Sequence, residues 1–139
     1  MKKLLDTESE VELIPLILSV EDDLDNQLLL KYIIDIYGWR SIFAANALEA
    51  ISMAKKHQPD LILLDIVLPD ISGLQIAMML KADRKTRSIP LIAVTGLSSK
   101  QEKDLIFATG FDDYVCKPYA LEELQTAIAS HLENKLAAI

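Results

Sequence analysis

Side chains capable of chemistry stand at the ends of four short apolar runs. The acidic triplet Glu21-Asp22-Asp23 follows the first of these runs, and a later run ends in Asp65. Another ends in Thr95-Gly96, and the last leads into Lys117-Pro118. Carboxylates that lie close together need a cation or raised pKa values to offset their repulsion. Because these are hard oxygen ligands without a His or Cys cluster, they favour Mg²⁺ binding over zinc binding.

The apolar runs have the length of β-strands, and segments with a helical period separate them. Leu30, Ile33, Ile34 and Tyr37 show this period near 3.6. The predicted strands are Ile14–Val20, Ser41–Ala45, Leu61–Leu64 with Asp65 at its end, Ile89–Thr95 and Tyr114–Cys116. Five strand–helix pairs predict an α/β fold with a parallel sheet, right-handed crossovers and helices on both faces. Because the ends of parallel strands meet at one edge, the reactive side chains should surround a single crevice.

Capping signals support the predicted helix boundaries. Three helix starts are indicated by the pairs Asn46 with Glu49, Ser72 with Gln75, and Ser99 with Glu102. Gly38 and Gly110 stand where helices should end, because glycine readily adopts the left-handed conformation of a helix C-cap.

Length and composition indicate one globular domain. The chain has 139 residues, of which 51% are apolar and 25% are charged. We expect a polar tail over residues 1–13, a domain over residues 14–136 and no output domain. The single cysteine, Cys116, cannot form an internal disulfide. No apolar run approaches the roughly 18 residues of a membrane span. These features predict a cytoplasmic protein with no membrane partner.

The charge balance argues against nucleic-acid binding. Lys and Arg number 14 against 21 Asp and Glu, which gives a net charge of −7. An acidic domain has no general attraction for nucleic acid. The cations Lys81, Arg84, Lys85 and Arg87 cluster in the sequence, and we interpret them as a solvated loop rather than a nucleic-acid site.

The strand-end residues belong to four motifs that occur in order along the chain. They are Ile17–Asp23 (ILSVEDD), Pro59–Gly73 (PDLILLDIVLPDISG), Ile89–Gly96 (IPLIAVTG) and Asp113–Pro118 (DYVCKP). With these motifs the chain resembles the receiver domains of bacterial two-component response regulators over about residues 14–136. Each motif is modest alone, but four in order at strand ends are specific. The resemblance implies a doubly wound, flavodoxin-like (βα)5 fold with strand order 2-1-3-4-5.

The resemblance implies a phosphoacceptor and a metal site. Asp65 matches the phosphoacceptor, whose carboxylate attacks a phosphoryl phosphorus and becomes an aspartyl phosphate. Glu21 and Asp22 match the acidic pair that holds Mg²⁺, and Asp65 with the backbone carbonyl of Val67 completes the protein ligands. Mn²⁺ can take the place of Mg²⁺. Glu21 stands where Asp is commoner and, being one methylene longer, can bind the metal through water.

Other family positions contact the phosphoryl group or respond to it. Thr95 matches the hydroxyl that hydrogen-bonds one phosphoryl oxygen, and Lys117 matches the ammonium that pairs with another. Pro118 is expected to follow a cis peptide bond that directs Lys117 inward. Tyr114 matches the aromatic switch residue, which turns inward when Thr95 moves toward the phosphate. The small Gly96 leaves the phosphate approach open.

Two apolar residues are expected to tune the lifetime of the aspartyl phosphate. In the family, the side chains at the positions of Val67 and Leu97 flank the approach of the hydrolytic water. Neither can orient a water molecule, and both can exclude one. The resemblance therefore implies slow self-dephosphorylation.

The favoured function is a phosphorylation-operated switch rather than an enzyme with its own substrate. The resemblance implies that a sensor histidine kinase or a histidine phosphotransfer protein supplies the phosphoryl group. It also implies an intrinsic, Mg²⁺-dependent self-phosphorylation from a small donor. A downstream protein would then bind the face formed by the fourth helix, the fifth strand and the last helix. A phosphate-shuttling intermediate of a multistep phosphorelay is an alternative. We expect a monomer or weak dimer, because the last helix offers Glu122 and Glu123 but no Arg for acidic–basic pairing.

Two other classes of function stay open. A Mg²⁺-dependent phosphohydrolase of the haloacid-dehalogenase type also uses an aspartate nucleophile. It needs Asp-x-Asp after the first strand and a cap insertion, whereas Asp65 follows the third strand. A receiver that has become a constitutive binding module typically lacks the aspartate, a member of the acidic pair or the lysine. All of these residues are present here.

Overall fold

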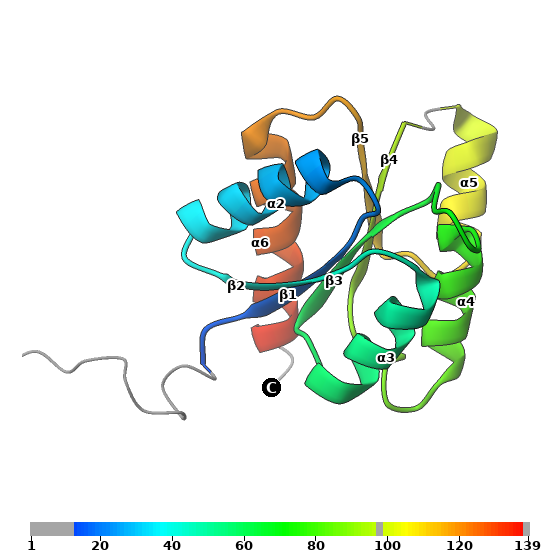
Figure 1. The fold of residues 1–139 in the computed structure, drawn as a ribbon, viewed down its shortest axis with the longest axis horizontal. Coiled ribbons are helices and arrows are strands. Elements are labelled where there is room, and N and C mark those ends of the chain that lie inside the picture. Colours follow the sequence, from blue (N-terminus) through cyan, green and yellow to red (C-terminus); the bar gives the residue numbers. More distant parts are fainter. Residues whose placement is uncertain (1–12, 97–98, 138–139) are drawn as a thin grey trace, which may run out of the picture.

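The computed structural model describes residues 13–96 and 99–137, along which strands and helices alternate (Figure 1). The strands are β1 (Leu16–Val20), β2 (Arg40–Ala44), β3 (Leu61–Asp65), β4 (Leu91–Thr95) and β5 (Asp113–Cys116). The helices are α2 (Leu24–Ile36), α3 (Ala47–His57), α4 (Gly73–Ala82), α5 (Lys100–Ala108) and α6 (Leu121–Ala137). Within these residues, no helix is long and apolar enough to cross a membrane. Of the expected polar tail, residues 1–12 lie outside the described part.

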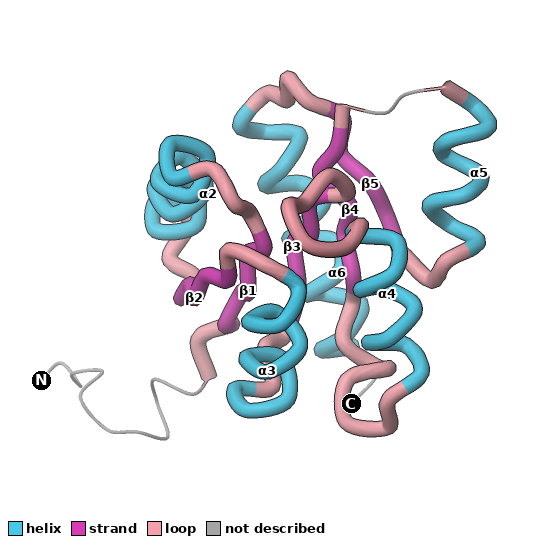
Figure 2. Tube along the Cα trace, turned by 45° about the vertical axis from the view of Figure 1, so that its right-hand side comes forward, coloured by secondary structure: helices cyan, strands magenta, loops and turns pink. Residues whose placement is uncertain are grey.

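The five strands form one parallel sheet in the order β2-β1-β3-β4-β5, which confirms the predicted order. Helices cover both faces of the sheet (Figure 2): α2 and α6 pack on one face, and α3, α4 and α5 on the other. The chain first moves outward from β1 to β2 and then returns to the other side of β1 at β3. The crevice of a doubly wound sheet forms at this reversal of direction.

The central strands supply the packed support for this crevice. β3 and β4 are buried along their whole length, as their uninterrupted apolar sequences predict. Successive side chains of a strand alternate between the two faces of the sheet. Ile17, Leu61 and Leu63 pack in the apolar core beside α2 and α6, whereas Leu18 and Ile62 pack in the core beside α3, α4 and α5. Burying each such side chain contributes roughly 1.5–3 kcal/mol. The strand ends are therefore held by packing on both sides.

Prolines delay the start of two strands. β1 and β4 each begin two residues later than predicted, at Leu16 and Leu91. In both strands a proline, Pro15 or Pro90, stands directly before the first strand residue. Proline has no N–H to donate to a neighbouring strand, so regular pairing begins after it. The other three strands lie within one residue of their predicted bounds.

The helix caps follow the sequence signals. Ser99 and Glu102 form a complete capping box, in which each backbone N–H donates to the other side chain at 3.1 Å. Asn46 caps α3 by accepting a hydrogen bond from the N–H three residues later. Gly38 and Gly110 follow helix ends with φ of 80° and 113°, conformations that favour glycine. These caps confirm the predicted boundaries of the helices concerned.

Candidate functional site

The carboxyl ends of four strands bring the predicted reactive residues to one edge of the sheet. Glu21 follows β1, Asp65 ends β3, Thr95 ends β4 and Lys117 follows β5. Glu21, Asp65 and Thr95 are buried, and the side chain of Lys117 is 31% exposed. The parallel sheet thus places carboxylates, a hydroxyl and an ammonium on neighbouring strands at the reversal of strand order.

Three carboxylates lie close enough together to share one cation. One carboxylate oxygen from each of Glu21, Asp22 and Asp65 lies within 4.8 Å of the other two. Glu21 and Asp65 are buried and Asp22 is exposed, so the cluster opens to solvent on one side. These donors are few, all are oxygens, and water can reach them. Such a set fits Mg²⁺, which keeps several of its waters when it binds to a protein.

Lys117 offsets part of the negative charge of the two buried carboxylates. Its Nζ lies 3.3 Å from Glu21 Oε1 and 3.2 Å from Asp65 Oδ2. Burial raises the pKa of the Glu21 carboxyl, although the Asp23 N–H and the Lys117 charge act in the opposite direction. Burial also disfavours the charged form of Lys117, but the Asp65 and Glu21 carboxylates outweigh it and raise the pKa of this ammonium. The lysine therefore stays charged beside the cluster.

Backbone contacts hold the segments that carry the carboxylates. The Glu21 N–H donates to the carbonyl of Ala44 at 3.0 Å, which joins the end of β1 to the end of β2. The Asp23 N–H donates to Glu21 Oε2 at 3.1 Å. The Val67 N–H donates to Asp65 Oδ1 at 3.1 Å. Each buried carboxylate therefore accepts a backbone N–H as well as facing the lysine.

The segments after β4 and β5 are joined in the same way. The Lys117 N–H donates to the carbonyl of Thr95 at 2.7 Å. The peptide bond between Lys117 and Pro118 is cis, as expected. A Cβ added to Gly96 would meet nothing within 4 Å, so the space beside Thr95 is open. Leu97, expected to flank this space, lies outside the described residues.

Tyr114 lies on β5 and contacts α5. Its ring is edge-on to that of Phe107, with ring centroids 5.7 Å apart. The ammonium of Lys103 lies 5.2 Å from the centroid of the Tyr114 ring. Tyr114 is half-buried on an edge strand of the sheet. The residue expected to act as a switch is thus placed between β5 and α5.

Gly73, to which the sequence analysis gives no role, lies against the backbone of Asp65. A Cβ at Gly73 would lie 2.2 Å from the carbonyl oxygen of Asp65 and 2.8 Å from the Cα of Ile66. The Gly73 N–H donates to the carbonyl of Ile66 at 2.8 Å. Only glycine lets α4 begin so close to the end of β3. One sequence signal is available: glycine is a poor helix former, yet it directly follows the capping residue Ser72.

A hollow of about 380 Å³ adjoins Glu21 and Lys117 along α2. It lies between α2, the end of β4 and the segment after β5. The residues that line it are Glu21, Asn26, Leu29, Leu30, Val94, Lys117, Pro118 and Tyr119. The site is therefore continuous with a partly apolar surface.

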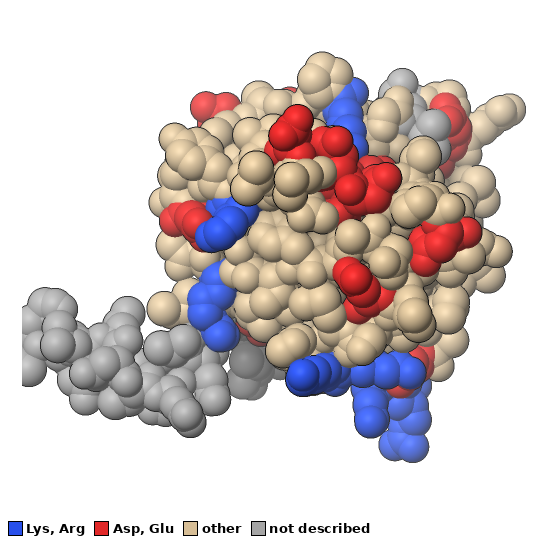
Figure 3. Space-filling view, viewed as in Figure 1, with Lys and Arg blue, Asp and Glu red and all other residues tan. Residues whose placement is uncertain are grey.

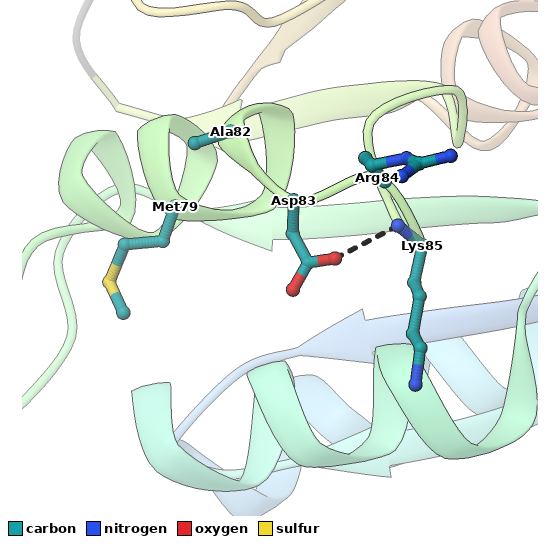
Figure 4. Close-up of a pocket in the computed structure, with 5 residues that line it drawn as sticks. All are labelled: Met79, Ala82, Asp83, Arg84 and Lys85. Carbon is teal, nitrogen blue, oxygen red and sulfur yellow. Dashed lines mark hydrogen bonds between the residues drawn. The ribbon is translucent and has the colours of Figure 1, made fainter.

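A second hollow lies at the C-terminal end of α4 (Figure 4). It is lined by Met79, Ala82, Asp83, Arg84 and Lys85. Figure 3 shows Lys and Arg gathered at the lower edge of the molecule and acidic side chains mainly above them.

The prediction that Lys81 belongs to a solvated loop is wrong. Lys81 lies in α4, and its ammonium pairs with Asp112 at 3.2 Å.

Comparison with known proteins finds relatives that are similar to this chain in sequence and in fold. The sequence model of the response regulator receiver domain matches residues 17–129. The polar-differentiation response regulator DivK of Brucella anthropi is 39% identical over 116 residues, which are 84% of this chain and 94% of that relative. DivK of Brucella ovis is 38% identical over the same length.

Two solved structures illustrate the structural likeness. A CheY-like response regulator receiver domain protein from Methanospirillum hungatei has a TM-score of 0.83 at 27% identity, covering 91% of this chain and 99% of that one. The receiver domain of the sensor histidine kinase PA1611 from Pseudomonas aeruginosa has a TM-score of 0.80 at 28% identity, covering 86% of this chain and 98% of that one. The latter structure has a magnesium ion coordinated in its active site cleft.

We expect Gly73→Ala to destabilise the fold, because the added methyl group overlaps backbone atoms that cannot move aside. Overpacking of this kind costs about 1–3 kcal/mol, which urea denaturation measures. Gly96→Ala is the matched control, since its methyl group enters open space and should change stability by less than about 0.5 kcal/mol. Equal stability of the two variants would contradict the close approach of α4 to β3.

Proposed function

Since the chain belongs to the family of response regulator receiver domains, we propose that it is a phosphorylation switch with Asp65 as its phosphoacceptor. The observation that carries this proposal is the set of contacts around the Asp65 carboxylate. The carboxylate lies at the end of a buried strand, with one oxygen facing the Val67 N–H and the other facing the Lys117 ammonium. A histidine kinase or a histidine phosphotransfer protein supplies the phosphoryl group.

In the proposed transfer, one carboxylate oxygen of Asp65 bonds to phosphorus while the bond from phosphorus to the donor nitrogen breaks. The electron pair of the broken bond stays on the donor. Lys117 already faces Asp65 and can pair with a phosphoryl oxygen as negative charge accumulates there. The Thr95 hydroxyl, at the end of the adjacent strand, hydrogen-bonds another oxygen. Gly96 leaves room for the incoming group.

Glu21, Asp22, Asp65 and the carbonyl of Val67 are the proposed protein ligands of Mg²⁺, with Mn²⁺ as a substitute. The three-carboxylate cluster supports this assignment because its donor set and solvent access suit the ion. When bound, the ion offsets the charge of the transferred phosphoryl group. With a small phosphodonor, the same site allows self-phosphorylation.

Tyr114 is the proposed link between the site and the surface that a downstream protein binds. Its contacts with Phe107 and Lys103 place it against α5, so a change in its position alters the surface formed by α5, β5 and α6. We propose that phosphorylation shifts the populations of two arrangements of this surface. A downstream protein that prefers one of them then binds differently to the two forms.

The α2 helix offers an apolar surface on which a donor protein can dock. Leu24, Leu28, Tyr32 and Ile36 recur every four residues along α2, and each is more than half exposed. The stripe begins two residues after Asp22 of the carboxylate cluster. Exposed apolar stripes of this kind mark protein interaction sites. A histidine-bearing donor bound to α2 would therefore lie next to Asp65.

We expect Asp65→Asn to abolish phosphorylation, because an amide is not a nucleophile of this kind. Incubation with acetyl phosphate and Mg²⁺ should add one phosphoryl mass to the wild type and none to the variant, as intact-protein mass spectrometry measures. A metal chelator should also prevent labelling. Asp35→Asn, which changes an exposed carboxylate on α2, is the control and should be labelled normally. Labelling of Asp65→Asn at the wild-type level would refute the assignment.

We expect Leu28→Ser to slow phosphotransfer from a protein donor but not from acetyl phosphate, because only the protein must dock on α2. The probe is a purified histidine phosphotransfer domain that labels the wild type. Removing one well-buried interface side chain weakens binding enough to slow transfer roughly tenfold when the concentration of the phosphotransfer domain is limiting. Leu48→Ser, equally apolar and 80% exposed but on α3, is the control. Equal slowing of the two variants would remove α2 as the docking surface.

We expect polar residues in place of Val67 and Leu97 to shorten the lifetime of the aspartyl phosphate. Val67 is 71% exposed beside the acceptor, and Val67→Asn combined with Leu97→Glu can orient a hydrolytic water. The double variant should lose phosphate roughly ten times faster, equivalent to about 1.4 kcal/mol in the barrier. Decay of purified phosphoprotein is the measurement. An unchanged lifetime would remove these two residues from the mechanism.

A further inference from the structure

The side chain of Asp70 joins the loop between β3 and α4 to the start of a different helix. Its Oδ1 and Oδ2 accept hydrogen bonds from the Ala47 N–H at 3.1 and 2.9 Å. Ala47 is the first residue of α3, where N–H groups have no partner within the helix. Although Asp70 is exposed, it therefore ties together two segments 23 residues apart in the chain.

The surroundings of Asp70 favour its charged form. Desolvation raises its pKa, but hydrogen bonds from the N–H groups of Ile71, Ala47 and Leu48 outweigh this and hold the pKa below its usual value. The partial positive charge of a helix N-terminus acts in the same direction. The tie is therefore present at neutral pH and is not a pH switch.

The tie links the loop that follows Asp65 to a segment that contacts the backbone of Glu21. Ala44, three residues before Ala47, accepts the N–H of Glu21 at 3.0 Å. Asp70 follows Asp65 by five residues. A continuous path of contacts thus runs from Glu21 through the end of β2 and the start of α3 to Asp70, and along the loop back to Asp65.

Two further hydrogen bonds of this loop lie at its base. The Val67 N–H donates to Asp65 Oδ1 at 3.1 Å, and the Gly73 N–H donates to the carbonyl of Ile66 at 2.8 Å. Val67 itself is 71% exposed. Asp70 adds a fixed point farther along the loop, so the segment between Val67 and Asp70 is held at both ends.

We propose that Asp70 is a positioning residue, which ties the β3–α4 loop to the start of α3 and so holds the Val67 segment in place for cation binding beside Asp65. This inference rests on the proposed function, because it concerns the same cation site. Asp70 does not touch the reacting atoms. Without the tie, the loop is mobile before an ion binds. The ion must then order the loop, and the loss of conformational entropy lowers the affinity for the ion.

The variant Asn46→Ala provides a matched control for Asp70→Ala. Asn46 caps the same helix by accepting the Glu49 N–H at 3.0 Å, a contact within the α3 segment. Each variant thus removes one cap from α3, but only Asp70→Ala releases the loop. Asp70→Asn keeps an oxygen that can accept the Ala47 N–H, so it should restore most of the effect.

The first measurement is amide hydrogen exchange at Val67 in metal-free protein. We expect Asp70→Ala to speed exchange roughly tenfold, because the loop opens more often, and Asn46→Ala to leave it within about twofold of the wild type. This readout needs neither metal nor phosphate. Unchanged exchange in Asp70→Ala would overturn the proposal.

The second measurement compares Mg²⁺ affinity by calorimetry with the rate of labelling at saturating Mg²⁺. Asp70→Ala should weaken Mg²⁺ binding about fivefold or more, and saturating Mg²⁺ should recover most of the labelling rate, because the bound ion orders the loop. Asp70→Asn should restore the affinity, and Asn46→Ala should retain it despite a similar loss in the midpoint of urea denaturation. Equal weakening by Asn46→Ala would assign the effect to helix stability and overturn the proposal. Wild-type protein that binds no Mg²⁺ would instead contradict the proposed function, and the exchange measurement would still decide whether Asp70 holds the loop.

Discussion

The structure depends on how two carboxylates are held at the end of an apolar sheet. Removing an ionised carboxylate from water costs several kcal/mol unless it is paired and hydrogen-bonded. Glu21 and Asp65 meet this condition through the ammonium of Lys117 and a backbone N–H each. With Asp22 included, the cluster holds three carboxylates against the one ammonium of Lys117, which leaves a surplus of two negative charges. A single divalent cation would offset this surplus.

The fold makes this cluster possible by confining polar groups to the ends of strands. β3 carries four buried apolar residues before Asp65, and helices cover it on both faces. The carboxylate can reach solvent only where the strand ends and the chain turns away. That turn is tight, because Gly73 brings the start of α4 against the Asp65 backbone. Asp65 is thus held on one side by the apolar packing of β3 and on the other by the close backbone contact with Gly73.

The positions of the candidate site residues are predictable because they follow from local sequence and from one rule of parallel sheets. Each stands at the end of an apolar run, and the ends of parallel strands share an edge. Contacts between distant parts of the chain were not predictable. The tie from Asp70 to α3 and the pairing of Lys81 with Asp112, 31 residues away, have no local signal. Gln58, which ends α3 with φ of 47°, occupies a conformation for which glycine would be expected.

The position of Lys117 connects the end of β3 with the segment that follows the edge strand β5. The lysine directly follows β5, its ammonium contacts the end of β3, and its N–H donates to the end of β4. Any group that competes for this ammonium therefore acts on the ends of two neighbouring strands at once. Tyr114 lies three residues earlier on β5 and packs against α5. Because β5 is an edge strand, paired on one side with β4, a shift of β5 would disturb its hydrogen bonds to one neighbouring strand, whereas a central strand is paired on both sides. The residue that follows β5 thus contacts Asp65, and the strand itself carries the aromatic ring that contacts α5.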